Sequence, residues 1–131
     1  MSNLTIVLDT SAYLTLVHLE TGHEVVSQRL MEANCVMSMV NLAEVLSKQA
    51  EFGIPTPQAL ALFHLTGVHL ESFSSKDAEL TGTLRQPTRA FGLSLGDRAC
   101  LALGRRLCCP VMTADRLWSQ LELGIDVLLI R

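Results

Sequence analysis

The sequence predicts an α/β fold with three layers, in which helices cover both faces of a parallel sheet. Short apolar runs alternate with segments of helical periodicity along the chain, and this alternation is typical of parallel sheets. The run Val127-Leu128-Leu129-Ile130 is apolar at successive positions, as expected for a strand that is buried on both faces. With 131 residues, the chain is expected to form one domain over residues 1–131.

The first half of the chain is expected to contain two strands and four helices. An apolar run rich in β-branched residues ends at Asp9, and Thr10 and Ser11 then provide capping side chains for a helix. Gly22 interrupts the helical periodicity, and Gly53 with the prolines after it ends a later helix. In chain order, we predict strand 4–8, helix 10–19, helix 23–33, strand 35–39, helix 41–50 and helix 58–65.

The second half is expected to contain three strands and three helices. Its first segment alternates in polarity like a strand, and the helix that follows ends before Pro87. Ser94 opens a long helical pattern, and two apolar runs near the end of the chain enclose a short helix. In chain order, we predict strand 68–73, helix 75–84, helix 94–107, strand 110–113, short helix 117–121 and strand 125–130.

Four acidic residues follow or open these elements: Asp9, Glu44, Asp97 and Asp115. Taken singly, each has a structural explanation, because acids at helix starts often act as caps, and Glu44 and Asp97 fit the spacing of a capping box. Taken together, they are expected at one edge of the sheet, where the carboxyl ends of parallel strands meet. Carboxylates that lie close together repel each other until a proton or a cation neutralises them.

A divalent cation is therefore the expected cofactor of this cluster. Oxygen ligands favour Mg²⁺ or Mn²⁺, and such an ion supports phosphodiester hydrolysis by activating a water molecule. The four histidines and four cysteines show no zinc-ligand spacing, and we expect the cysteines to be reduced thiols of the core.

The composition predicts a partner and no membrane segment. Hydrophobic residues make up 49% of the chain and charged residues 18%, so we expect a partner chain or a second copy to cover part of the surface. No apolar stretch approaches the roughly 20 residues that span a bilayer. The N-terminus lacks the pattern of a secretion signal, which predicts a cytoplasmic protein.

The net charge of −3 argues against broad, non-specific binding of nucleic acid. It leaves room for a local basic strip, because several arginines lie in the second half of the chain. Solvated arginines scattered over helix faces are an equally good explanation of the same residues. The six are Arg85, Arg89, Arg98, Arg105, Arg106 and Arg116.

Four segments carry a resemblance to PIN-domain ribonucleases, and most closely to the VapC-type toxins of toxin-antitoxin pairs. They are LDTSA at residues 8–12, SMVNLAEV at residues 38–45, LGDRACLALG at residues 95–104 and TADR at residues 113–116. The resemblance implies a five-stranded parallel sheet in an α/β/α sandwich. It also implies that the metal is held by the acids Asp9, Glu44, Asp97 and Asp115.

The resemblance implies further roles and partners. Ser11 and Thr113 match positions whose hydroxyls help to hold water or the fourth acid, although a capping or turn role explains them equally well. The implied activity is that of an RNA endonuclease, the toxin of a pair, which cuts structured RNA. The implied protein partners are a cognate antitoxin, which covers apolar helices and reaches the acidic site, and a second copy in a homodimer.

A rival function keeps the fold without the chemistry. In that case the chain is a non-catalytic binding module that sequesters a protein or an RNA. The two functions differ in their dependence on metal, because a nuclease loses cleavage in EDTA or on Asp9→Asn while a binder keeps its partner.

Overall fold

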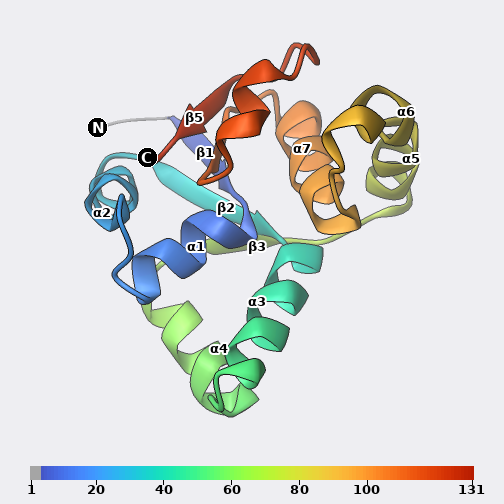
Figure 1. Ribbon diagram of the computed structural model, residues 1–131. Coiled ribbons are helices and arrows are strands. Elements are labelled where there is room, and N and C mark those ends of the chain that lie inside the picture. Colours follow the sequence, from blue (N-terminus) through green and yellow to red (C-terminus); the bar gives the residue numbers. More distant parts are fainter. Residues whose placement is uncertain (1–3) are drawn as a thin grey trace.

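The computed structural model describes residues 4–131, and a five-stranded, all-parallel sheet runs through this part of the chain (Figure 1). The strands lie in the order β3-β2-β1-β4-β5. Their bounds are β1 (Thr5–Leu8), β2 (Asn34–Ser38), β3 (His69–Glu71), β4 (Val111–Thr113) and β5 (Val127–Leu129). The predicted three-layer α/β fold is confirmed.

Helices of the first half of the chain cover one face of the sheet. They are α1 (Thr10–Val17), α2 (His23–Glu32), α3 (Met39–Glu51) and α4 (Thr56–Leu65). The apolar cluster on this side includes Ile6 and Leu8 of β1, Tyr13 of α1 and Phe63 of α4. The rings of Tyr13 and Phe63 lie 5.3 Å apart between their centroids, which joins α1 to α4.

Helices of the second half cover the other face. They are α5 (Ser75–Thr83), α6 (Arg85–Thr88), the 3₁₀ helix η1 (Arg89–Phe91), α7 (Leu95–Leu107) and the 3₁₀ helix η2 (Arg116–Gln120). The cluster on this side includes Val7 of β1, Leu101 of α7 and Trp118 of η2. Strand β1 therefore alternates between two cores, because Ile6 and Leu8 face one and Val7 the other.

The strand order has a topological switch point between β1 and β4. From β1 the chain crosses to β2 on one side, and it later returns to β4 on the other side. From the carboxyl end of β1 the chain continues to β2, and from that of β4 to β5, so the two connections leave this central pair of strands in opposite directions. In open parallel sheets, ligands bind in the crevice outside the strand ends at such a point.

Most predicted bounds differ from the structure by one to three residues, and three differences at helix starts have a clear physical reason. Helix α3 begins at Met39 rather than at residue 41, because Ser38 accepts a hydrogen bond from the backbone N–H of Val40 and caps the helix there. Helix α4 begins at Thr56, since Pro57 fits in a first turn that needs no N–H from it. Helix α6 was not predicted at all, and Pro87 again lies in the first turn.

The expectation of four core cysteines is wrong in part. Cys35 and Cys100 are buried, whereas Cys108 is exposed and Cys109 is half-buried. Cys108 follows the last turn of α7 with a left-handed backbone, φ 54°, so it belongs to the surface turn that ends this helix.

Within the described residues, none of the helices is both long enough and apolar enough to cross a bilayer.

Two helical glycines give a matched test of how closely α7 packs on the sheet. A Cβ at Gly104 of α7 would meet the side chain of Val111 in β4, whereas a Cβ at Gly82 of α5 would meet nothing. We expect Gly104→Ala to lower the free energy of unfolding by about 1–3 kcal/mol through overpacking. We expect Gly82→Ala to raise it by about 0.5–1 kcal/mol through helix propensity. Urea denaturation measures both, and a stabilising Gly104→Ala would contradict the packing.

Candidate functional site

Asp9 follows β1 and is the most enclosed of the four acids, with 4% of its surface exposed. Oδ1 accepts hydrogen bonds from Ser11 Oγ at 2.7 Å and from the backbone N–H of Ala12 at 2.8 Å, so Asp9 caps α1. Oδ2 accepts one from Thr113 Oγ1 at 2.6 Å. Burial raises the pKa of Asp9 to about 6, because these hydrogen bonds only partly offset it and the charge of Asp97 adds to it.

Glu44 reaches the same region from the second turn of α3. Its Oε1 accepts hydrogen bonds from Thr10 Oγ1 at 2.7 Å and from Asn41 Nδ2 at 3.1 Å. A Cβ at Gly96 would overlap the carboxylate of Glu44, so the glycine allows this carboxylate to lie against the first turn of α7. The interpretation of Glu44 as a capping-box residue is wrong, because Ser38 is the cap and Asn41 lies inside the helix.

Asp97 lies in the first turn of α7 and forms the capping box that the sequence predicts. Its backbone N–H donates to Ser94 Oγ at 3.2 Å, and its Oδ2 accepts from the backbone N–H of Ser94 at 3.0 Å. Burial raises the pKa of Asp97 against these hydrogen bonds, and the charges of Glu44 and Asp115 raise it further. Asp97 is therefore both a structural cap of α7 and a member of the acidic cluster.

Asp115 lies on the exposed rim, after β4. Its Oδ1 accepts from the backbone N–H of Leu117 at 3.0 Å and caps η2, as the structural explanation predicted. Its own backbone N–H donates to Thr113 Oγ1 at 3.0 Å, and the backbone N–H of Ala114 donates to Ser11 Oγ at 2.9 Å. Ser11 and Thr113 therefore join the Asp9 carboxylate to the loop that carries Asp115.

The structure brings the four acids to one edge of the sheet. Asp97 is coupled by charge to Asp9, Glu44 and Asp115. Buried Cys100, one turn further along α7, has a pKa raised well above its usual value by burial and by the charges of Asp9, Asp97 and Glu44. No ion pair in the described part of the chain involves any of the four acids, so their charge is not balanced by lysine, arginine or histidine.

The donor set is all carboxylate oxygen, which fits Mg²⁺ or Mn²⁺. In the described region, no three acidic, histidine or cysteine side chains are arranged to enclose an ion as they stand. Three of the four acids accept hydrogen bonds as helix caps, and Asp115 lies at the rim. An ion would therefore draw some of these side chains inward, and the unbalanced charge favours that change.

Sequence reasoning missed three residues that support Glu44. Thr10 and Asn41 donate to it, and Gly96 makes space for it. The spacing of Asn41 and Glu44 does stand out in the sequence, but there it predicts a capping box and not a contact within the site. The role of Thr10 has no sequence signal of its own, because the contact joins residues 34 positions apart.

Three of the six arginines of the possible basic strip are engaged in hydrogen bonds within the chain, and the other three are exposed. Arg98 donates to the carbonyl oxygen of Thr81, Arg105 to that of Leu123, and Arg106 to Asp77, so these three tie helices and loops together. Arg85, Arg89 and Arg116 are exposed, and among the described residues none forms an ion pair.

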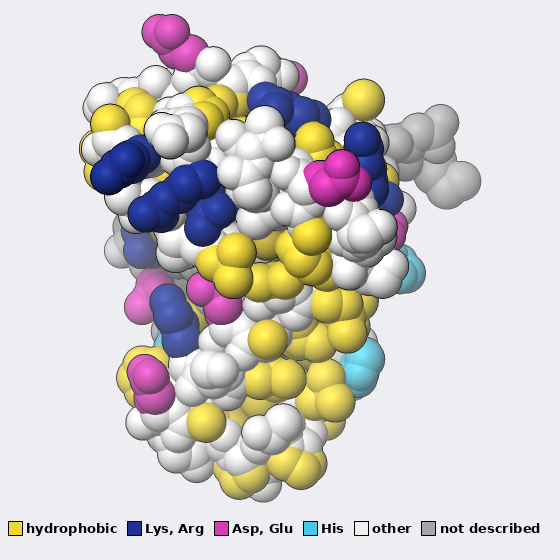
Figure 2. All heavy atoms as spheres, turned by 90° about the vertical axis from the view of Figure 1, so that its right-hand side faces the viewer, with side chains coloured by type: hydrophobic (Ala, Val, Ile, Leu, Met, Phe, Trp, Pro, Cys, Tyr) yellow, Lys and Arg dark blue, Asp and Glu magenta, His cyan; other side chains and the backbone are white. Residues whose placement is uncertain are grey.

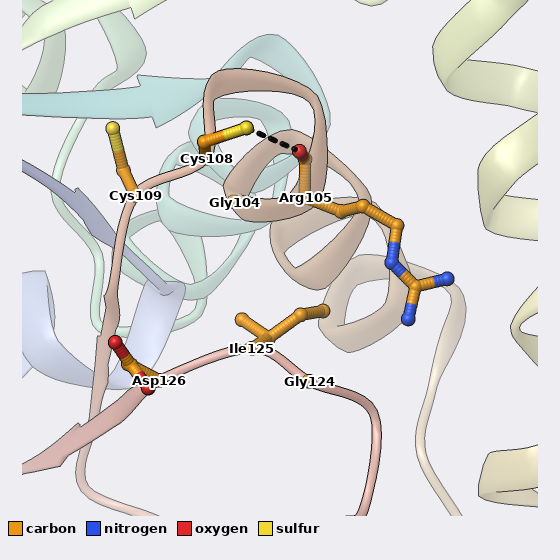
Figure 3. A pocket seen from close by; sticks show the side chains of 7 residues that line it. All are labelled: Gly104, Arg105, Cys108, Cys109, Gly124, Ile125 and Asp126. Atoms are coloured by element: carbon orange, nitrogen blue, oxygen red, sulfur yellow. Dashed lines mark hydrogen bonds between the residues drawn. The ribbon is translucent and has the colours of Figure 1, made fainter.

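A hollow of about 300 Å³ lies at the other end of the strands, beside the amino ends of β4 and β5 (Figure 3). It is formed by the end of α7, the turn after it and the segment before β5, and Cys108, Cys109, Ile125 and Asp126 are among its lining residues. Among the residues that the structure describes, Asp126 is the single carboxylate that lines it, in contrast to the four at the acidic edge.

The raised pKa of Asp9 predicts a pH-dependent loss of stability. The folded-state pKa of about 6 lies above the usual value of 3.8, so the stability linked to Asp9 is complete below pH ~4 and is lost as the pH rises through 6. We expect Asp9→Asn to be more stable than the wild type by roughly 1–3 kcal/mol at pH 7.5 in EDTA, and equal to it at pH 4. Urea denaturation across this range measures the difference. Asp126→Asn is the control, and identical pH profiles for Asp9→Asn and the wild type would contradict the burial of an unbalanced charge.

Comparisons with known proteins agree with this geometry. Solved structures similar to the chain include VapBC2 from Rickettsia felis bound to a DNA fragment from their promoter, with a TM-score of 0.72, 14% identity, and coverage of 95% of this chain and 98% of that one. VapC20 from Mycobacterium tuberculosis, a toxin that cleaves the sarcin-ricin loop, gives a TM-score of 0.71 and 16% identity, covering 92% and 98%. DNA-bound VapBC from Salmonella typhimurium gives 0.71 and 18%, covering 98% and 99%.

At these identities the similarity concerns the fold. No curated protein matches the chain in sequence. The family model of the PIN domain matches residues 6–122, which include all four acids and both hydroxyl residues that contact Asp9. The chain therefore belongs to the PIN-domain family.

Proposed function

We propose that this chain is a divalent-metal-dependent RNA endonuclease and the toxin of a toxin-antitoxin pair. The observation that carries the proposal is the set of four carboxylates at the carboxyl edge of the sheet, none of which forms an ion pair with any residue of the described range 4–131. Membership of the PIN-domain family supports nuclease chemistry at this edge. The proposed nuclease domain extends over residues 1–131.

Asp9, Glu44, Asp97 and Asp115 would hold the ion, Mg²⁺ or Mn²⁺. When bound, such an ion supplies Lewis-acid stabilisation of the phosphate and acidifies the attacking water. The protein's own contribution is to hold the oxygens in place before the substrate arrives. Asp9 is fixed by three hydrogen bonds and Asp97 by its capping box, while Asp115 at the rim remains open to solvent and to the substrate.

RNA is the proposed substrate. The similarity to a toxin that cleaves the sarcin-ricin loop supports a structured RNA. Figure 2 shows lysine and arginine side chains gathered in the upper half of the face that carries α5 and α6. Arg85 and Arg89 belong to α6 and η1, which precede α7 in the sequence, and their exposed side chains are proposed to contact phosphates of the RNA. A local basic region can attract RNA although the chain as a whole carries a net charge of −3.

The proposed protein partners are an antitoxin and a second copy of the chain, with the cytoplasm as the place of action. Several of the similar structures are toxin-antitoxin complexes, which supports an antitoxin. Large apolar side chains are exposed near the end of α3 and on α4, including Phe52 at 68% and Leu65 at 83%. Figure 2 shows apolar side chains gathered in the lower half of the same face, and a partner would cover such a surface.

Metal-dependent RNA cleavage tests the proposal. We expect the purified protein, freed of antitoxin, to cleave ribosomal or transfer RNA with Mg²⁺ or Mn²⁺ and to stop in EDTA. Asp97→Asn keeps an acceptor for the capping box but removes the charge, so its cleavage rate should fall on the order of 100-fold or more. Asp126→Asn removes the same charge at the other end of the strands and should change the rate less than about twofold.

Gel analysis with mapped RNA ends measures these rates. Cleavage that persists in EDTA, or that is unchanged in Asp97→Asn, would refute the acidic edge as the catalytic site. RNA binding without any cleavage would instead favour a non-catalytic module.

A further inference from the structure

Asn41 is a buried polar residue at the point where α1, α3 and α7 meet. It lies in the first turn of α3 and is 1% exposed. Helix capping does not explain it, because Ser38 already caps α3. Packing does not require it either, because Leu42 and Val45 beside it fill the core, and an aliphatic side chain of similar volume would fit a buried position as well.

The amide nitrogen of Asn41 faces three acceptors. Nδ2 lies 3.1 Å from Glu44 Oε1, 3.1 Å from the carbonyl oxygen of Gly96 and 3.2 Å from Thr10 Oγ1. Carboxylate and carbonyl oxygens only accept, so the opposite orientation of the amide would place oxygen against oxygen. Among the described residues Asn41 Oδ1 has no hydrogen-bond partner, and an unpaired buried acceptor destabilises a folded protein. The nitrogen contacts are therefore what this residue contributes.

We propose that Asn41 is a positioning residue for Glu44, an inference that rests on the proposed metal-dependent function. Asn41 and Thr10 both donate to Oε1 of Glu44. In the described part of the chain no donor contacts Oε2, so the two residues fix one oxygen and leave the other for a cation.

The same amide also anchors the first turn of α3 to α7. Its hydrogen bond to the carbonyl oxygen of Gly96 joins the first turn of α3 to the residue before Asp97. Gly96 has no Cβ to push Glu44 away from this point. Asn41 therefore ties the helix that carries Glu44 to the first turn of α7, and so fixes where the Glu44 carboxylate lies beside Asp97.

The test measures the affinity of the metal-free protein for Mn²⁺ alone by isothermal titration calorimetry. Asn41→Leu removes the donors and the unpaired oxygen. The matched control is Gln49→Leu, because Gln49 is also 1% exposed on α3 but contacts His18, at 2.7 Å. We expect Asn41→Leu to weaken Mn²⁺ binding about 10-fold or more without a lower melting temperature than the control. Gln49→Leu should remain within about twofold of the wild type.

A double-mutant cycle separates positioning from a general effect on the site. If Asn41 acts through Glu44, Asn41→Leu should cause less than about twofold further loss of Mn²⁺ affinity in a Glu44→Gln background. Additive losses would overturn the inference. If Asn41→Leu does not fold, Asn41→Ala removes the same donors without added bulk and enters the same comparison.

The outcomes distinguish this inference from the proposed function. A wild type that binds Mn²⁺ and cleaves RNA, with an equally tight Asn41 variant, overturns the positioning role alone. A wild type that binds no Mn²⁺ overturns the positioning role and the proposed function together.

Discussion

Unbalanced negative charge at one edge of the sheet is the constraint on which the account depends. Asp9 is held below the surface by three hydrogen bonds, yet burial still raises its pKa to about 6. No ion pair in the described chain relieves it or its three acidic neighbours. A fold that keeps such a group loses stability near neutral pH, and a bound cation would restore it.

The two apolar cores make this arrangement rigid. Strand β1 is buried on both faces, which anchors the backbone from which Asp9 projects. Helix α7 packs closely enough on β4 that Gly104 has no room for a Cβ, and this fixes the first turn that carries Asp97. Helix caps then orient the carboxylates, since Asp9, Asp97 and Asp115 each accept a backbone N–H. Capping and membership of the cluster are compatible roles for one residue.

Much of the fold could be predicted because its signals are local. Apolar runs predict four of the strands and an alternating segment predicts β3, and in a parallel sheet the edge that gathers Asp9 and Asp115 follows from strand direction alone. The missed features depend on contacts between distant segments. Thr10 meets Glu44 across 34 positions, and Asn41 was assigned to a cap because the start of α3 was placed two residues too late. Pro87 predicts the end of a helix, whereas in the structure it lies in the first turn of α6.

Anomalous X-ray diffraction from crystals of the protein soaked in Mn²⁺ would test the central claim most directly. The account predicts a manganese peak among the carboxylate oxygens of Asp9, Glu44, Asp97 and Asp115, with Asp97 in contact and with the side chains drawn inward. The peak should vanish in crystals of Asp97→Asn. Manganese only at other surfaces, such as the hollow beside Asp126, or no ordered manganese at saturating concentration, would contradict it.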